Sequence, residues 1–308
     1  MKKLLLLTAA ALLILVLAAC GDSDNGDADG GDEESINPDE LVMGFVPSQD
    51  SDEIADTVEP LADRLGEILE RDVEPRTMTN YNALVEAMGS GQVHIGFIPA
   101  FGYVIANDDY DVEVILKSVR HGSDTYRAQY VVRSDSGIES LEDLEGATWA
   151  YADATSTSGF LFPASQLMDR FEIDSQSDLT SNWFGDTVQV GGHDTAAIAV
   201  YDGDADVATT FEDVRENLEE DYPDIFDELD VIDYTDDIPN DTISVIDELD
   251  DELVDEIREA FLSFNEDEEM IQVMNDVYTW DEITEAEHSE YEIVAETYER
   301  FSDSVSLD

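Results

Sequence analysis

The sequence contains very few basic residues: 13 Lys and Arg stand against 77 Asp and Glu, and the formal net charge is −64. Lysine occurs only as Lys2, Lys3 and Lys117. Nucleic acid is excluded as a partner, because binding to phosphate backbones needs clustered Lys and Arg. So many carboxylates are typical of very salty surroundings, where the Debye length falls to about 3 Å at 1 M and screens self-repulsion.

Cysteine is also nearly absent: the chain has one, Cys20, which excludes an intrachain disulfide and a multi-cysteine metal site. Met1-Lys2-Lys3 and the apolar run Leu4 to Ala19 have the pattern of a secretory signal. The run ends in Leu17-Ala18-Ala19-Cys20-Gly21, which resembles the lipobox of bacterial lipoproteins. We therefore predict a signal peptide over 1–19 and a lipid on Cys20. The alternative is an ordinary signal peptide or anchor helix with an incidental cysteine.

Large apolar side chains are nearly absent between Cys20 and about Asn37: Ile36 is the exception, and Gly, Asp, Ser, Asn and Glu dominate. Such a segment cannot pack against a core, so 20–37 is predicted to be a disordered acidic tether. The whole chain is nevertheless 43% hydrophobic. That content is enough for one large domain or two lobes.

Strand and helix patterns alternate beyond residue 40, which predicts α/β architecture with mostly parallel sheets. Strands are predicted at 41–46, 72–78, 93–98, 112–119, 128–133, 147–151, 187–190, 205–209 and 242–246. Helices are predicted at 54–69, 81–89, 100–106, 140–145, 158–171, 194–202 and 212–220. From 248 to 301 the pattern is helical throughout.

One segment has the composition of an anion-binding turn. Ala154-Thr155-Ser156-Thr157-Ser158-Gly159 follows a predicted strand and precedes a predicted helix. The free amides at a helix start, together with three or four hydroxyls, can donate hydrogen bonds to an oxyanion. A single Ser or Thr here would also serve as an ordinary helix N-cap. The residues alone leave both interpretations open.

Five separated segments carry a resemblance to a known family. They are Tyr81 to Met88, Gly91 to Ala100, Ser156 to Gly159, Gly192-His193-Asp194 and Asp204 to Ala208. In this order the chain resembles, over about Leu41 to Val245, the phosphate/phosphite/phosphonate-binding proteins of ABC importers. The resemblance implies a two-lobed α/β periplasmic-binding-protein fold (type II) with the ligand cleft between the lobes. It places lobe one at 38–127 plus 238–308 and lobe two at 128–237.

The same resemblance implies an oxyanion site. Tyr81 matches a tyrosine that reaches the oxyanion from lobe one, and His193 matches an imidazole donor. The anion-binding turn of lobe two is matched by Ser156, Thr157 and Ser158. From the residues alone, Tyr81 could equally be an aromatic packed at a helix start, and His193 could be a turn residue.

The resemblance also implies how the far end of the ligand is held. Asp213 and Asp241 match two acids that meet it there. Because carboxylates disfavour a fully deprotonated ligand without an amine, these acids suggest a protonated or amino-bearing ligand. Tyr126 lies where the family has an aromatic pair, but Arg127 follows it, so that a guanidinium could partner the anion.

We therefore predict a monomeric, lipid-anchored, extracytoplasmic solute-binding protein without enzymatic activity, cofactor or metal. Its partners would be a phosphorus oxyanion, an ABC permease, a cytoplasmic ATPase and the membrane that holds its lipid. A receptor for a metal or cationic osmolyte is an alternative, although the histidines are scattered. A secreted hydrolase is another: Gly-x-Ser-x-Gly and His-Glu-x-x-His motifs are absent from the sequence, but acidic pairs for glycoside cleavage stay open. A purely structural surface protein is the third.

Overall fold

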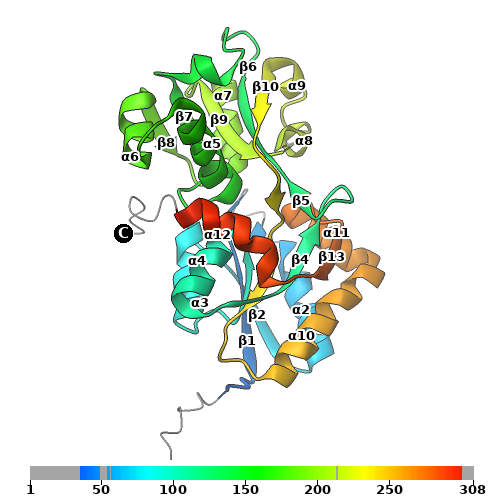
Figure 1. Ribbon diagram of the computed structural model, residues 1–308. Helices are drawn as coiled ribbons and strands as arrows, with labels where there is room; N and C mark the ends of the chain where they lie inside the picture. The colour runs from blue at the N-terminus through cyan, green and yellow to red at the C-terminus, as the bar shows by residue number, and fades with distance from the viewer. Residues whose placement is uncertain (1–34, 49–53, 56, 213, 300–308) are drawn as a thin grey trace, which may run out of the picture. The chain divides into compact units, whose positions relative to one another are not determined.

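The computed structural model describes residues 35–48, 54–55, 57–212 and 214–299. The chain from Ser35 onward forms one compact unit that contains two sheets (Figure 1). We call the six-stranded sheet with its helices the first lobe and the five-stranded sheet with its helices the second lobe. The signal peptide, Cys20, nearly all of the tether and Asp213 lie outside the described residues.

The strands of the first lobe follow the order β13-β4-β12-β3-β1-β2. They are β1 (Glu40–Phe45), β2 (Asp72–Thr77), β3 (Ile95–Ile98), β4 (Glu113–Val119), β12 (Thr242–Val245) and β13 (Glu282–Glu285). The second lobe has the order β10-β6-β9-β7-β8. Its strands are β6 (Ala128–Arg133), β7 (Thr148–Tyr151), β8 (Asp186–Gln189), β9 (Val207–Phe211) and β10 (Leu229–Tyr234). A third, two-stranded sheet pairs β5 (Thr125–Tyr126) with β11 (Ile238–Pro239).

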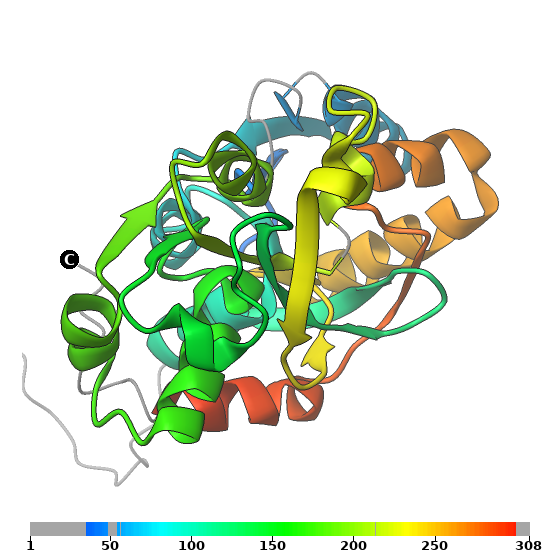
Figure 2. The ribbon, with the colours of Figure 1, turned by 90° about the horizontal axis from the view of Figure 1, so that it is seen from above.

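Helices surround each sheet. Those of the first lobe are α2 (Glu59–Leu69), α3 (Tyr81–Gly89), α4 (Ala100–Tyr110), α10 (Asp251–Ser263), α11 (Glu268–Tyr278) and α12 (Glu292–Glu299). Those of the second lobe are α5 (Phe162–Phe171), α6 (Gln176–Asp178), α7 (His193–Asp202), α8 (Val214–Leu218) and α9 (Ile225–Glu228). Helix α12, red in Figures 1 and 2, packs against α4. Short 3₁₀ and π-helical segments cover Leu141–Leu144, Thr157–Leu161, Leu179–Trp183, Phe264–Glu266 and His288–Tyr291.

The α/β alternation is confirmed, but the prediction of mostly parallel sheets is wrong. Strand β1 pairs in parallel with β2 and β3, and β7 pairs in parallel with β8 and β9. Every pair made by β4, β6, β12 or β13 is antiparallel. The reason is connectivity: β4 and β12 lead into and out of the second lobe, so no helical crossover within one sheet forces them to be parallel.

Besides the two-residue strands β5 and β11, two strands of the larger sheets lie where the sequence did not predict them. The expected helical region 248–301 is interrupted by β13, a short edge strand that pairs antiparallel with β4 and buries Ile283. Strand β10 contains two acids in six residues, which weakens any strand pattern, yet it pairs along the edge of β6. Both strands are short edge strands, whose existence depends on the neighbouring strand more than on their own sequence.

Each lobe has its own aromatic core. In the first lobe Phe97 stacks on Phe45 with ring centroids 4.5 Å apart and lies edge-on to Phe261 at 5.6 Å. In the second lobe Trp149 stacks on Phe160 at 5.2 Å and on Phe184 at 4.8 Å. Buried aromatic pairs stabilise a fold beyond the contribution from the apolar area that they bury. Each sheet is therefore a rigid support for the residues at its edge.

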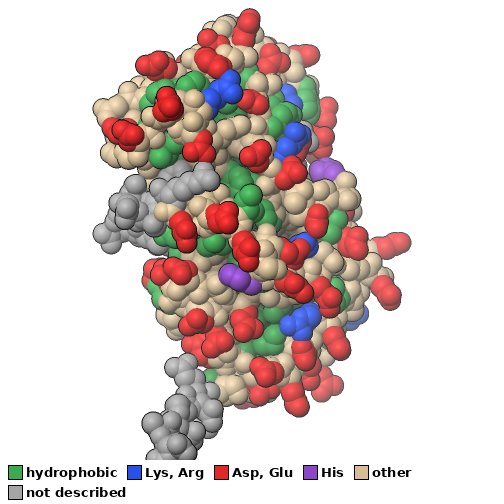
Figure 3. All heavy atoms as spheres, viewed as in Figure 1, with side chains coloured by type: hydrophobic (Ala, Val, Ile, Leu, Met, Phe, Trp, Pro, Cys, Tyr) green, Lys and Arg blue, Asp and Glu red, His purple; other side chains and the backbone are tan. Residues whose placement is uncertain are grey.

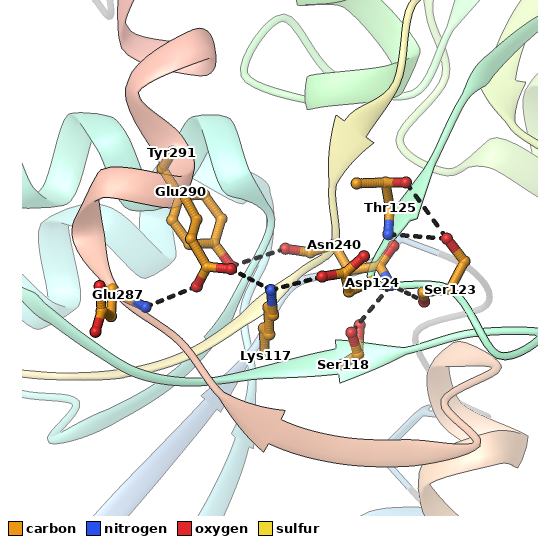
Figure 4. Close-up of polar contacts among 9 residues, drawn as sticks. All are labelled: Lys117, Ser118, Ser123, Asp124, Thr125, Asn240, Glu287, Glu290 and Tyr291. Carbon is orange, nitrogen blue, oxygen red and sulfur yellow. Dashed lines mark hydrogen bonds and ion pairs between the residues drawn. The ribbon is translucent and has the colours of Figure 1, made fainter.

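The two crossing segments meet in the β5–β11 pair, where Ile238 lies opposite Tyr126. A buried polar cluster fastens this crossing to the first lobe (Figure 4). The Asn240 Nδ2 donates to the carbonyl oxygens of Ser118 at 3.0 Å and Ser123 at 2.9 Å. The Tyr291 hydroxyl donates to the Asn240 carbonyl at 3.1 Å. The crossing is therefore held at a defined register next to β4.

Lys117 lies at the centre of this cluster and bridges two carboxylates (Figure 4). Its Nζ donates to Asp124 Oδ2 at 3.0 Å and forms a second, close ion pair with Glu290. Burial by itself lowers the pKa of Lys117, but the two carboxylates outweigh that effect and the pKa is raised. The only lysine of the described residues thus serves the crossing between lobes.

The surface is strongly acidic: carboxylate side chains cover the face shown in Figure 3, and basic side chains are few. Among the described residues, no helix combines the length and the apolar character needed to cross a membrane.

Candidate functional site

A small enclosed cavity lies where residues of both lobes and of the crossing meet. Its lining residues are Ser48, Tyr81, Pro99, Arg120, Tyr126, Ser156, Thr157, Ser158, His193, Phe211, Asp241 and Tyr278. The space open to the centre of a water molecule is about 20 Å³. That space is only slightly more than one water molecule needs, so the cavity suits a compact group.

The predicted anion-binding turn forms one wall. Ser156 is the N-cap of the π-helical segment Thr157–Leu161, which continues directly into α5. The Ser156 Oγ accepts from the Gly159 N–H at 3.1 Å. Ser156 therefore does act as an N-cap, as the simpler interpretation expected, and it also faces the cavity. π-Helical turns are rare and occur mostly at functional sites.

Gly159 allows this wall to close. A Cβ atom at Gly159 would lie 2.8 Å from Ser156 Oγ and 3.3 Å from His193 Cε1. Any other residue would push these two side chains apart. The glycine of the predicted turn is thus required by a close approach of side chains.

His193 begins α7 directly after Gly192, and its imidazole packs against the Phe211 ring at 5.0 Å between centroids. Its Nε2 lies 3.2 Å from Ser156 Oγ. Ser156 Oγ can donate its proton to Nε2 while it accepts from the Gly159 amide; in that tautomer the imidazole proton is on Nδ1. Nδ1 is buried and has no hydrogen-bond partner within the described part of the chain.

His193 is neutral at ordinary pH. Burial, with a further contribution from the Arg120 charge, lowers the pKa of His193 to about 3. The site therefore offers an imidazole N–H rather than an imidazolium. A neutral donor is suited to a ligand whose negative charge is held mainly by directed hydrogen bonds.

Tyr81 reaches the cavity from the first residue of α3, whose N-cap Asn80 accepts from the Ala83 N–H at 2.8 Å. Its side chain is buried, and its hydroxyl has no hydrogen-bond partner among the described residues. Burial, followed by the charges of Asp153 and Asp241, raises the pKa of Tyr81 well above its usual value; the Ser156 hydroxyl nearby offsets this only in part. Tyr81 thus stays protonated and can donate.

Two more tyrosines line the cavity. Tyr126 comes from the crossing strand β5, and burial raises the pKa of its hydroxyl. Tyr278, at the end of α11, donates to the Val46 carbonyl at 2.9 Å. The Tyr278 hydroxyl is therefore occupied by the protein and forms a wall. Sequence reasoning missed Tyr278, because it lies in a helix that reads as generic and acidic.

Arg120 is the most consequential residue that sequence reasoning missed. Its guanidinium forms an ion pair with Asp241, and the two side chains are only 10% and 16% exposed. It lies over the rings of Tyr126 at 5.4 Å and Phe211 at 6.0 Å from their centroids. A signal was present: a rare cation at the end of a buried strand, followed by the turn residues His121 and Gly122.

Arg127, which the sequence suggested as a charge partner of the anion, is not in the cavity. Its guanidinium pairs with Glu212 and lies 4.1 Å from the centroid of the Tyr234 ring. The reason is strand geometry: successive side chains of an extended chain point in opposite directions, so that Tyr126 faces the cavity and Arg127 faces away. Arg127 lines a larger neighbouring pocket.

Contacts across the cavity join the two lobes. The Phe101 N–H of α4 donates to Thr157 Oγ1 at 2.9 Å. The His193 N–H donates to the Ser48 carbonyl at 2.9 Å. These bonds join the residues of the cavity wall directly, so the lobes are closed on one another at this point.

Of the residues expected at the site, the structure brings seven together: Tyr81, Tyr126, Ser156, Thr157, Ser158, His193 and Asp241. Arg127 is outside the cavity and Asp213 is outside the described residues. The described lining residues present hydroxyl, imidazole and guanidinium donors and a single carboxylate, which is already paired. This arrangement suits an oxyanion. Among the described residues, no group of three or more His, Cys, Asp or Glu side chains is placed to hold a metal ion.

Comparison with known proteins agrees with this chemistry. The family model described as "ABC transporter, phosphonate, periplasmic substrate-binding protein" matches residues 43–291. The phosphate-import protein PhnD of Mycolicibacterium smegmatis is 29% identical over 209 residues, which are 67% of this chain and 64% of that protein. The phosphonates-binding periplasmic protein of Escherichia coli is 28% identical over 190 residues, 60% of this chain and 54% of that protein. The matched region thus spans less than two thirds of either relative.

Solved structures show the same fold. A binding protein component of an ABC phosphonate transporter from Pseudomonas aeruginosa superposes with a TM-score of 0.76 at 23% identity, covering 84% of this chain and 85% of that one. A Prochlorococcus marinus protein in complex with methylphosphonate superposes with a TM-score of 0.75 at 18% identity, covering 87% and 100%. The two-lobed periplasmic-binding-protein fold is therefore confirmed. Because the family model matches most of the folded chain, this protein belongs to the family of periplasmic substrate-binding proteins of phosphonate ABC transporters.

Proposed function

We propose that this protein is the extracytoplasmic solute-binding component of an ABC importer and holds a phosphorus oxyanion, phosphonate, phosphate or phosphite, between its lobes. One observation carries the proposal. Tyr81 Oη, His193 Nδ1 and Arg120 Nε belong to residues that line one cavity, and each is buried without a hydrogen-bond partner among the described residues. Unpaired buried polar atoms are costly and rare in folded proteins. A tetrahedral oxyanion with several acceptor oxygens would satisfy them together.

The relatives support the choice of ligand class. One is named for phosphate import, another for phosphonate binding, and a protein of the same fold was solved with methylphosphonate. The cavity adds a physical reason of its own, because most of its donors are uncharged groups fixed by the fold. Such donors bind an anion through directed hydrogen bonds and do not need a strongly basic surface.

We also propose lobe boundaries at 38–127 plus 238–308 and at 128–237. The β4-to-β6 and β10-to-β12 crossings support these positions, since both pass through the β5–β11 pair. Binding of ligand would favour the closed arrangement in which Thr157 and His193 contact the first lobe. Permease and ATPase partners would respond to that closed state. The protein performs no bond-making step in this proposal and acts as a monomer that requires no cofactor.

The N-terminal proposal is that residues 1–19 are a signal peptide and that Cys20 carries a lipid, which holds the mature protein at the outer face of the membrane. The acidic surface is proposed to be an adaptation to high salt. A Cys20→Ser variant tests the anchor: we expect the protein to move from the membrane fraction to the medium and to lose incorporation of labelled fatty acid. Retention of the label in this variant would contradict the anchor.

The proposed function is tested by isothermal titration calorimetry of the purified protein with inorganic phosphate, phosphite and methylphosphonate, and with glycine betaine and Zn²⁺ as competitors from other classes. We expect one-to-one binding of at least one phosphorus compound and none of the competitors. Binding of only betaine or Zn²⁺ would favour the cationic alternatives and reject the proposal. Release of inorganic phosphate from methylphosphonate on prolonged incubation would contradict a purely binding role.

A further inference from the structure

We propose that the Arg120–Asp241 ion pair sets the specificity of this cavity: it admits a compact phosphorus oxyanion without an amine and excludes aminoalkyl phosphonates. The inference rests on the proposed function and names the ligand class more narrowly. The sequence suggested a protonated or an amino-bearing ligand, and this inference keeps the first and replaces the second.

Arg120 is held in place by its own backbone. Its N–H donates to the Ser123 carbonyl at 2.9 Å, and the Ser123 N–H donates back at 2.8 Å. Between them His121 and Gly122 adopt positive φ angles of 50° and 74°, which make a tight turn. The guanidinium therefore leaves a rigid turn and lies over the rings of Tyr126 and Phe211. It is a fixed part of the wall.

The charges of the cavity leave no place for an ammonium group. Among the described residues that line the cavity, Asp241 is the single carboxylate, and its Oδ2 is already paired with Arg120. An ammonium beside Asp241 would share one carboxylate with a guanidinium, and two cations in a poorly solvated site repel each other strongly. The buried Arg120 Nε, by contrast, has no partner in the described part of the protein and can donate to an anionic oxygen.

The walls also limit the length of a substituent. Arg120, Tyr126 and Phe211 line both the cavity and the neighbouring pocket, so they form the partition between the two. The neighbouring pocket offers about 360 Å³ to the centre of a water molecule, against about 20 Å³ in the cavity. A methyl group or a fourth oxygen adds a single heavy atom to the phosphorus group, so it needs the least space beside this partition. An aminoethyl chain has to displace the guanidinium from its two rings.

Calorimetry with inorganic phosphate, methylphosphonate and 2-aminoethylphosphonate tests the inference. For the unmodified protein we expect phosphate or methylphosphonate to bind at least tenfold more tightly than 2-aminoethylphosphonate. Arg120→Gln should lose at least tenfold toward the first two and gain toward 2-aminoethylphosphonate, because Asp241 becomes available to the ammonium. Arg127→Gln, the matched change on the other side of the partition, should alter no dissociation constant by more than about twofold.

The possible failures are distinguishable. Unmodified protein that binds 2-aminoethylphosphonate as tightly as methylphosphonate would overturn this inference and leave the proposed function intact. Protein that binds none of the three compounds and does not bind phosphite would overturn both. If Arg120→Gln does not fold, Asp241→Asn gives a second test: it keeps the guanidinium and removes the only carboxylate of the described lining residues, so it should gain no affinity for 2-aminoethylphosphonate. A gain in that variant would also overturn the inference.

Discussion

Two arginine–carboxylate pairs lie near the partition between the cavity and the neighbouring pocket, and they differ in burial and in what they line. Arg120 and Asp241 are 10% and 16% exposed, whereas Arg127 and Glu212 are 39% and 27% exposed. The first pair borders the closed cavity and the second only the larger, neighbouring pocket. An exposed pair is worth little and a buried one depends strongly on both partners. The comparison teaches that burial, and not the presence of a cation, distinguishes the arginine that lines the cavity.

The largest expected difference between the two ion pairs appears when the carboxylate of each pair is removed. Asp241→Ala leaves the Arg120 charge buried without its partner, so we expect the free energy of unfolding to fall by about 3 kcal/mol. Glu212→Ala, the matched control, should cost no more than about 1 kcal/mol, because Arg127 remains solvated. Urea denaturation measures both values. Equal losses would show that the difference in burial has no energetic consequence.

The next largest effect concerns the wall opposite Arg120. Ser156→Ala removes the oxygen that caps the Gly159 N–H and contacts His193, and we expect binding of the preferred phosphorus compound to weaken by about ten- to hundredfold, or about 1.5–3 kcal/mol. The exposed hydroxyl of Ser136 donates to the Arg133 carbonyl and accepts from the Ile138 N–H, as Ser156 Oγ accepts from an amide, but Ser136 does not line the cavity; Ser136→Ala is therefore the control. Unchanged affinity in the Ser156 variant would show that the turn is a structural cap alone.

The pH dependence of stability tests the environment of His193, whose pKa is lowered by burial and by the nearby Arg120 charge. The folded protein holds the pKa of His193 at about 3, whereas the unfolded chain titrates near 6.5. Between these values the unfolded state binds a proton that the folded state does not, so the stability contributed by neutral His193 is complete above pH 6.5 and is lost as the pH falls toward 3. We expect a slope of about 1 kcal/mol per pH unit from this group.

His193→Gln should remove that slope, as measured by urea denaturation at several pH values between 4 and 7. The exposed His121 supplies the control variant, His121→Gln, which should keep it. An identical pH dependence of the unmodified protein and the His193 variant would contradict burial of a neutral imidazole.

The smallest expected effect is on the exposed side of the partition. Arg127→Gln should change the free energy of unfolding by less than about 1 kcal/mol, and the difference should disappear in 1 M salt, where exposed charges are screened. Thermal unfolding at low and high salt measures this. A large, salt-independent loss would show that the Arg127 pair is more than a surface contact.

The turn between β7 and α5 shows how much of the site could be predicted from sequence. Ser156, Thr157 and Ser158 are consecutive, and a strand before them and an apolar helix after them are visible as local patterns. Their amides and hydroxyls gather at one helix start because local geometry alone dictates it. Tyr81 was predictable in the same way as the first residue of α3, although its direction into the cavity was not.

Arg120 and Tyr278 could not be predicted, because no local pattern connects them to the turn. Arg120 is separated from Asp241 by 121 residues, and the two meet only when the crossing strands return to the first lobe. Tyr278 reaches the cavity from the end of α11, a helix whose sequence carries no motif of a ligand site. Arg127 lies outside the cavity because its side chain points away from that of Tyr126. The sequence could not reveal this alternation, because strand β5 has only two residues.

Sequence by itself determined the acidic solvated surface, the α/β alternation and the turn of hydroxyl residues, since each follows from composition or from short-range periodicity. Only the tertiary structure decided the mixed sheet direction, the closed cavity and the choice of Arg120 over Arg127. The physical reason is that burial and ion pairing are properties of space shared by distant segments. One residue of offset along an extended chain is enough to place a charge inside the site or outside it.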